Sequence, residues 1–425
     1  MIRYSNCTLL DGTRDMTARP NMSVLVDNGR IAGICSDSEA PKTDETVDLG
    51  GSYLLPGLIN LHIHLPASGK PKKKQTDNAK LVRLLMSNAV TRYAVDRMCE
   101  SYALTELLSG CTTVRTVGGV RSVDSRVRDR IARNEINGPR MLVANMAVSV
   151  PGGHMAGSLA YEATSAENAR ELVGRIAETG PDLIKLMITG GVLDAKKVGE
   201  PGELKMPPEY VKAACDEAHR LGYMVAAHVE SPEGVRVALE NGVDTIEHGA
   251  EPDDEIIRLF KEKGARLVTT LSPALPYALF DRSVSYCSEM EQANGRIVFD
   301  GIVDCAKAAL ENGIPVGLGT DTGCPFITHY DMWRELNYFV KYCGVTPTFA
   351  LYTATLGNAR IVGIDSETGS IEAGKSADFI VCAKDPTEDL SALRDLELVV
   401  MRGKAFPRPR IRKNKMIEKE LDKWL

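Results

Sequence analysis

The 425-residue sequence lacks several patterns that would place it in a specialised class. Its ten cysteines show no Cys-x-x-Cys spacing, so neither a zinc ribbon nor a small disulfide framework is indicated. It has no N-terminal signal pattern and no apolar run of about 18 residues that could span a bilayer. A formal net charge of −6 is not the basic footprint of a nucleic-acid-binding protein. We expect a cytoplasmic protein with buried thiols and neither membrane nor nucleic acid as a partner.

The middle of the chain also lacks a Gly-x-Gly-x-x-Gly turn opening a first helix, which disfavours an open doubly wound sheet. Short apolar strands alternate there with amphipathic helices. Pro207–Leu221 is a predicted helix followed by the strand Tyr223–Ala227, and Ser231–Asn241 is a helix followed by Val243–Glu247. Ser231 is a suitable N-cap for the second helix. The repeated alternation favours a parallel sheet closed into a (β/α)8 barrel.

Strand patterns of another kind occur at both chain ends. Met22–Val26 and Arg30–Ile34 flank a turn-forming Asn28-Gly29 and predict a hairpin. Ala377–Cys382 and Leu398–Met401 are again rich in β-forming residues, so the two ends should share one domain. The expected α/β architecture has three parts: a small β-sandwich domain from residues 1–56 plus 363–407, a TIM-type (β/α)8 barrel over 57–362, and a basic tail with a short helix over 408–425.

The most informative stretch is Leu58–Pro66, which contains His62-Ile63-His64. Side chains at i and i+2 share one face of a strand, so both imidazoles point the same way. Two neutral imidazoles on one rigid strand make half of a site for a divalent metal ion.

Further potential ligands stand at predicted strand ends. His228 ends Val-Ala-Ala-His, His248 ends Thr-Ile-Glu-His, and Asp321 ends Gly-Leu-Gly-Thr-Asp. Four of only seven histidines thus fall where a barrel places its active site. This recurrence predicts a metal site.

Lys185 lies inside the apolar strand Asp182–Ile188. Such a lysine would ordinarily extend to water or form a salt bridge. Beside four imidazoles and an aspartate, an ammonium would repel the metal ions. A neutral amine that captures carbon dioxide becomes an anionic carbamate that can bridge two cations, which would remove the conflict.

Taken in order, these residues and the segment Gly369–Phe379 resemble the metal-dependent amidohydrolase superfamily over essentially the whole chain. Within it, the chain is similar to the imidazolonepropionase-related branch that contains Xaa-Pro dipeptidases (prolidases). The resemblance implies two divalent ions, usually zinc. One would be held by His62, His64 and Asp321, the other by His228 and His248, with carboxylated Lys185 bridging both.

The resemblance also implies a reaction. Two cations sharing a water lower its pKa and supply hydroxide near neutral pH. Asp321 would accept the proton and pass it to the leaving nitrogen. The reaction class is hydrolysis of an amide C–N bond, such as that of a dipeptide or an N-acyl amino acid.

The substrate contacts are predicted from fewer residues. Pro151-Gly-Gly-His154 resembles a loop that binds substrate in the prolidase-like branch, and we add Glu230 and His329 as substrate-binding residues. Deaminases of the superfamily commonly carry a Glu three residues after the His of the fifth strand. Here Glu230 follows His228 by two residues, so deamination is disfavoured.

The basic run Lys70–Lys74 is either a lid over the site or a solvated loop.

Two alternatives accompany the amidohydrolase hypothesis. One is an imidazolonepropionase-like hydrolase that opens a cyclic amide. The other is a non-catalytic relative that acts in binding or assembly, although all six metal-site positions are present. We expect a small-molecule substrate and a homo-oligomer.

Overall fold

A computed structural model describes residues 1–73 and 76–425. The chain divides into two compact units. The first comprises Met1–Asn60, Leu104–Val114 and Tyr330–Leu425, and the second comprises Leu61–Ala103 and Arg115–His329.

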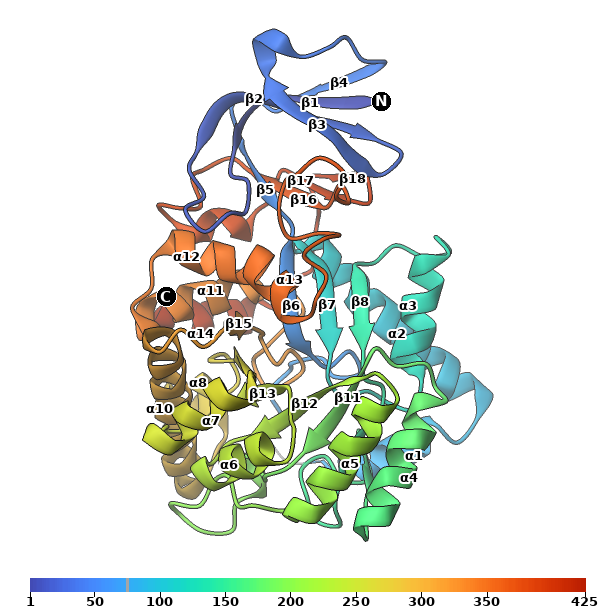
Figure 1. The fold of residues 1–425 in the computed structure, drawn as a ribbon, viewed down its shortest axis with the longest axis vertical. Helices are drawn as coiled ribbons and strands as arrows, with labels where there is room; N and C mark the ends of the chain where they lie inside the picture. Colours follow the sequence, from blue (N-terminus) through green and yellow to red (C-terminus); the bar gives the residue numbers. More distant parts are fainter. Residues whose placement is uncertain (74–75) are drawn as a thin grey trace. The chain divides into compact units, whose positions relative to one another are not determined.

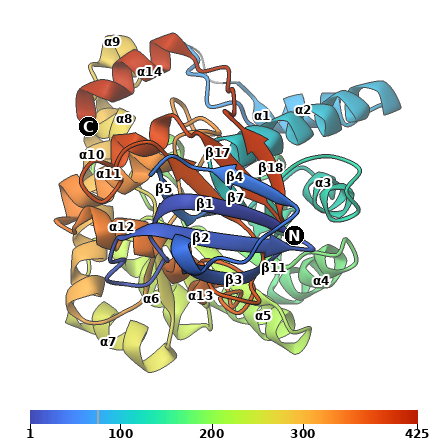
Figure 2. The ribbon, with the colours of Figure 1, turned by 90° about the horizontal axis from the view of Figure 1, so that it is seen from above.

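The first unit contains an eight-stranded sheet built from both chain ends, in the order β18-β17-β16-β5-β1-β2-β3 with β4 beside β1. Its strands β1, β2 and β3 lie side by side in Figure 2. The bounds are β1 Ile2–Leu9, β2 Arg19–Asp27, β3 Arg30–Ser36, β4 Glu45–Asp48, β5 Tyr53–Pro56, β16 Phe379–Cys382, β17 Leu398–Met401 and β18 Lys404–Pro407. These strands belong to one sheet, so the second layer of the expected β-sandwich stays a prediction.

The predicted hairpin is confirmed in this sheet. Strands β2 and β3 pair antiparallel, with Asp27 opposite Arg30. The two turn residues between them, Asn28 and Gly29, have φ angles of 46° and 77°. Positive φ at both central positions is what a two-residue type I′ hairpin requires, and Asn-Gly adopts it readily.

The second unit contains a seven-stranded parallel sheet in the order β10-β9-β11-β12-β13-β14-β15. Helices α4, α5 and α6 lie against its strands (Figure 1). The strands are β9 Ala147–Ser149, β10 Ala160–Glu162, β11 Leu183–Met187, β12 Met224–Val229, β13 Thr245–His248, β14 Arg266–Thr269 and β15 Val316–Leu318; the helices that alternate with them are α4 Ala166–Ala177, α5 Pro208–Arg220, α6 Pro232–Glu240 and α7 Asp254–Lys263. The strand–helix alternation is therefore confirmed. Ser231 caps α6 as predicted, because its side chain accepts a hydrogen bond from the Gly234 backbone.

A separate three-stranded sheet has the order β6-β7-β8, with β6 Leu58–Ile63, β7 Cys111–Thr116 and β8 Arg140–Val143. An isolated parallel bridge joins Ile63 at the end of β6 to Thr322, shortly after β15. The fold is α/β with a seven-stranded parallel sheet. A continuously closed eight-stranded barrel stays a prediction.

The other helices are α1 Asn78–Leu85, α2 Ala89–Leu108, α3 Val123–Ala132, α8 Leu275–Leu279, α9 Arg282–Ser285, α10 Glu289–Glu311, α11 Met332–Cys343, α12 Pro347–Tyr352, α13 Asn358–Ile361 and α14 Lys415–Leu421. The alternating pattern of the sequence also predicts a helix over Arg296–Asn312, and this prediction is wrong at its start. Ser288 and Glu291 form a reciprocal capping box that begins α10 at Glu289. Within the described chain, none of these helices combines the length and apolar character needed to cross a membrane.

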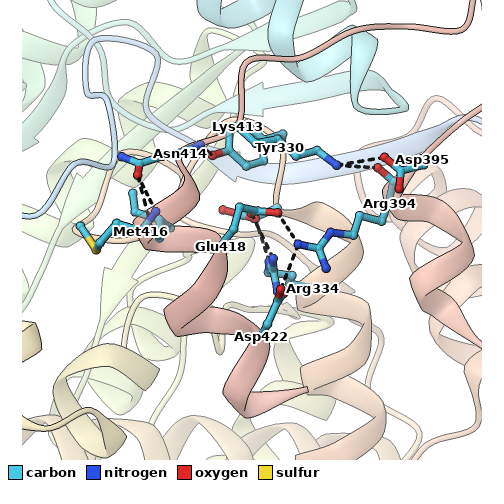
Figure 3. Close-up of polar contacts among 11 residues, drawn as sticks. Tyr330, Arg334, Arg394, Asp395, Lys413, Asn414, Met416, Glu418 and Asp422 are labelled. Carbon is cyan, nitrogen blue, oxygen red and sulfur yellow. Dashed lines mark hydrogen bonds and ion pairs between the residues drawn. The ribbon is translucent and has the colours of Figure 1, made fainter.

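The C-terminal tail ends in the predicted short helix, α14, which is tied to α11 by buried ion pairs (Figure 3). Arg334 is fully buried and lies 3.1 Å from Asp331, 3.0 Å from Glu418 and 2.7 Å from Asp422. Arg394 shares the Glu418 and Asp422 carboxylates at 2.6 and 3.0 Å. We call these five residues the Arg334 cluster.

Candidate active site

The predicted metal-site residues all belong to the second unit and are buried. His62 lies in β6 and His64 follows it, while Asp321 comes three residues after β15. Strands β11, β12 and β13 present the remaining three, Lys185, His228 and His248. Parallel register places His228 beside Met187 and His248 beside Val229. The site is therefore built on rigid neighbouring strands.

The structure brings these side chains into two groups able to hold a metal ion. In the first, one ligand atom each of His62, His248 and Asp321 lies within 4.8 Å of the others. Asp321 Oδ1 is also 3.3 Å from His64 Nε2 and 3.6 Å from His62 Nε2. In the second group, His228, Glu230 and His248 meet the same 4.8 Å limit. His248 belongs to both groups, so the two sets of donors adjoin.

The protonation states suit metal binding. Burial, followed by the charge of Lys185, lowers the pKa of His62 to about 4. Burial also holds the pKa values of His228 and His248 well below the ordinary range. These imidazoles are neutral at pH 7, as ligands must be. For Asp321, burial would raise the pKa, but His62 and His64 outweigh it and the carboxylate is ionised.

Lys185 is 1% exposed, and within residues 1–73 and 76–425 its Nζ has no hydrogen-bond partner. Burial is the main cause that lowers its pKa to about 8, with Arg115 acting in the same direction. An unpaired buried amine is costly. Its neutral fraction near pH 7 is much larger than that of an ordinary lysine. The chemistry of this donor set fits divalent metal ions.

A second layer of buried charge orients His62. Its Nδ1 donates to Glu247 Oε2 at 2.8 Å, and both Glu247 oxygens accept from Arg115 Nη2 at 2.7 and 2.8 Å. Arg115 Nε in turn donates to the Leu61 carbonyl at 2.6 Å. For Glu247, burial would raise the pKa, but Arg115 and His62 outweigh it and the carboxylate is ionised. The proton on Nδ1 therefore leaves the Nε2 lone pair of His62 for a metal.

Sequence reasoning missed Arg115 and Glu247. Their signal was a charged residue within each of two short strand segments, β7 and β13.

His64 and His248 are oriented by neutral partners. His64 Nδ1 lies 2.8 Å from the Gly118 carbonyl, which can only accept, so Nδ1 carries the proton and Nε2 faces Asp321. His248 Nδ1 lies 2.6 Å from Thr270 Oγ1.

The backbone is strained where two of the ligands leave their strands. His248 has φ of 71° and Asp321 has φ of 53°, a left-handed conformation uncommon for residues other than glycine. Such strain is typical of functional sites, where the surrounding structure fixes a costly conformation. Gly319 permits close packing nearby, because an added Cβ would lie 2.5 Å from His62 Cβ.

Two of the three predicted substrate contacts lie beside the histidines. The His154 ring stacks on His228 with centroids 4.1 Å apart, and its Nδ1 is 2.6 Å from Asp194 Oδ2. Glu230 belongs to the second ligand group. The His329 ring instead stacks on the Tyr102 ring, with centroids 4.3 Å apart, and its Nε2 lies 2.8 Å from the Ala67 carbonyl oxygen. Its contact with substrate stays a prediction.

The predicted basic run is described only in part. Lys73 lies 5.7 Å from the centre of the Tyr286 ring. Lys74 lies outside the described residues.

Comparison with known proteins finds relatives over nearly the whole chain. A candidate prolidase from Bifidobacterium longum is 36% identical, with 99% of this chain and 98% of that chain covered and a TM-score of 0.87. The structure of a Xaa-Pro dipeptidase with methionine in its active site is 28% identical, with 96% and 99% covered and a TM-score of 0.83. Ochratoxinase of Aspergillus niger is 26% identical over 92% of this chain and 84% of its own.

The family model described as the amidohydrolase family matches residues 53–406. This chain is a member of the metal-dependent amidohydrolase superfamily and a hydrolase of amide C–N bonds.

Proposed function

We propose that this protein is a binuclear metal hydrolase that cleaves the amide bond of a dipeptide, such as an Xaa-Pro dipeptide, or of an N-acyl amino acid. The observation that carries the proposal is the convergence of His62, His248 and Asp321 ligand atoms within 4.8 Å, beside the unpaired buried amine of Lys185. Zinc is the expected metal, since imidazole and carboxylate ligands suit it.

When bound, divalent ions would lower the pKa of water and polarise the substrate carbonyl. His62, His64 and Asp321 would hold one ion, and His228 and His248 the other. Lys185, as a carbamate, would bridge them. Glu247 and Arg115 keep the Nε2 lone pair of His62 directed into the site.

Asp321 is the group that would move the proton. Its carboxylate is ionised and lies between His62 and His64, so it can accept a proton from water and deliver it to the leaving nitrogen. His154 would orient the substrate carbonyl or carboxylate, since Asp194 fixes its ring against His228.

The substrate class rests on likeness to a Xaa-Pro dipeptidase and to ochratoxinase. The proposal also includes a homo-oligomer and a cytoplasmic location. It includes a division of the chain into a closed barrel and a sandwich domain.

The test is metal content per chain, paired in one preparation with a hydrolysis screen. The screen would contain Xaa-Pro and other dipeptides, N-acyl amino acids and cyclic amides. Two ions per chain and release of an amino acid support the proposal. Opening only of cyclic amides would instead favour an imidazolonepropionase-like enzyme, and no turnover after metal is restored would overturn the proposal.

A further inference from the structure

Glu230 is a half-buried residue whose carboxylate the proposed pair of metal sites does not use. Its Oε2 is inaccessible to solvent and, within residues 1–73 and 76–425, accepts no hydrogen bond. The negative charges of Asp321 and Asp194 act on this carboxylate, and the backbone of Val192 donates a hydrogen bond to it. A buried carboxylate oxygen without a hydrogen bond is costly.

The position of Glu230 is fixed. It follows β12, and its backbone N–H donates to Thr189 Oγ1 at 3.0 Å. A Cβ added to Gly191 would lie 3.5 Å from its Oε2, and one added to Gly202 would lie 2.2 Å from its carbonyl. The close packing of Gly202 against the Glu230 backbone leaves this segment little room to move.

The neighbours of Glu230 are two neutral imidazoles. Its carboxylate oxygen lies within 4.8 Å of ligand atoms of both His228 and His248. These two histidines stand on adjacent parallel strands in register, with His248 beside Val229. Two imidazoles and one carboxylate form a ligand set that holds catalytic zinc in other enzymes while leaving a position open.

We propose that Glu230 is a direct ligand of the second metal ion and completes a three-residue site with His228 and His248. This inference rests on the proposed binuclear function and changes the set of ligands proposed for the second ion. The second ion then has three ligands of its own, and its binding does not depend on the carbamate of Lys185. Glu230 thereby acquires a role other than the substrate contact predicted from sequence.

The first test is metal affinity of the full-length protein, stripped with a chelator and titrated with Zn²⁺. Glu230→Gln keeps the size of the side chain and removes its charge. We expect one ion to bind at least about tenfold more weakly, since even residues that only support a ligand cost about 10- to 100-fold when lost. The matched control is Glu233→Gln, three residues away and exposed, which should bind both ions like the wild type.

A second variant separates Glu230 from the bridging lysine. Lys185→Met should still bind one ion at His228, His248 and Glu230, and adding Glu230→Gln should remove it. In Co²⁺-loaded protein, the visible absorption of the ion at this site should be present in Lys185→Met and absent from the double variant, since it reports coordination.

The outcomes distinguish the two proposals. If Glu230→Gln binds both ions with wild-type affinity but hydrolyses substrate poorly, Glu230 is a substrate contact and only this inference falls. If the wild type binds no metal and shows no turnover, the proposed function falls with it.

Discussion

Two regions of this molecule bury charged side chains in opposite ways. In the Arg334 cluster, every guanidinium faces carboxylates of the same chain, at 2.6–3.1 Å. In the candidate active site, Lys185 Nζ and Glu230 Oε2 have no hydrogen-bond partner within the described chain. The charges of the first region are thus paired within the chain, although Arg334 Nη1 makes an ion pair with Asp422 and no hydrogen bond among the described residues. In the second region, Lys185 Nζ and Glu230 Oε2 are left without a hydrogen bond from any described residue.

This difference separates structural charge from functional charge. A buried ion pair is costly to break because the surviving partner is left uncompensated. An unpaired buried group is also costly, and a bound metal ion or substrate can compensate it. Burial of charge alone does not distinguish the two regions, but the ion pairs of the Arg334 cluster do.

The largest expected effect is on catalysis. Asp321→Asn should reduce turnover by about 10²- to 10⁴-fold, since positioned general acid–base groups contribute on that order. The fold and part of the metal content should be retained. Steady-state kinetics on the substrate found by the screen, with metal analysis of the same sample, is the measurement. Wild-type turnover would exclude a role for Asp321 in proton transfer.

The next effect is on the stability of the complete region. Arg334→Met should lower the free energy of unfolding by about 3–5 kcal/mol, because it strands the buried carboxylates of Asp331 and Glu418. Urea unfolding measures it. Metal content per folded chain should equal that of the wild type. A stability change below about 1 kcal/mol would show that the cluster is not a tightly coupled ion network.

Glu247→Gln tests whether Glu247 and Arg115 only stabilise the fold, as the Arg334 cluster does, or also support metal binding. We expect metal affinity to fall by about 10- to 100-fold, because His62 loses the ionised partner that fixes its tautomer. Zn²⁺ titration with a competing chelator is the measurement. Unchanged affinity would mean that Arg115 and Glu247 only stabilise the fold.

Substitution of Lys185 should affect stability in the opposite way to substitution of Arg334. In metal-free protein, Lys185→Met should change the free energy of unfolding by less than about 1 kcal/mol, or increase it, since no partner is lost. The same variant should lose turnover. Strong destabilisation of the metal-free variant would reveal a structural role for the amine and weaken the comparison.

The smallest effect is a pH dependence in the Arg334 cluster. Burial would raise the pKa of Asp422, but hydrogen bonds from Arg334 and Arg394 outweigh it and the pKa is lowered. A lowered folded-state pKa adds stability above the unfolded value of about 3.9 that is lost as the pH falls through the folded value. Asp422→Asn should therefore be less stable than the wild type by a few tenths of a kcal/mol near pH 7. The difference should vanish in acid, as urea unfolding at both pH values can show.

Local patterns determined much of this protein. Alternation along a strand put His62 and His64 on one face, Asn28-Gly29 set a hairpin, and Ser231 marked a helix start. Each of these depends on residues a few positions apart, so the sequence carries the information directly. The order of ligands at successive strand ends likewise followed from the repeated strand–helix pattern.

Only the tertiary structure decided which distant charges meet. Glu247 is 185 positions from His62 and 132 from Arg115, and Glu418 is 84 from Arg334. No periodicity encodes such pairs, because they depend on how separate strands and helices pack. The same packing left Lys185 Nζ and Glu230 Oε2 without a hydrogen bond within the described chain, and it placed them among the predicted metal ligands.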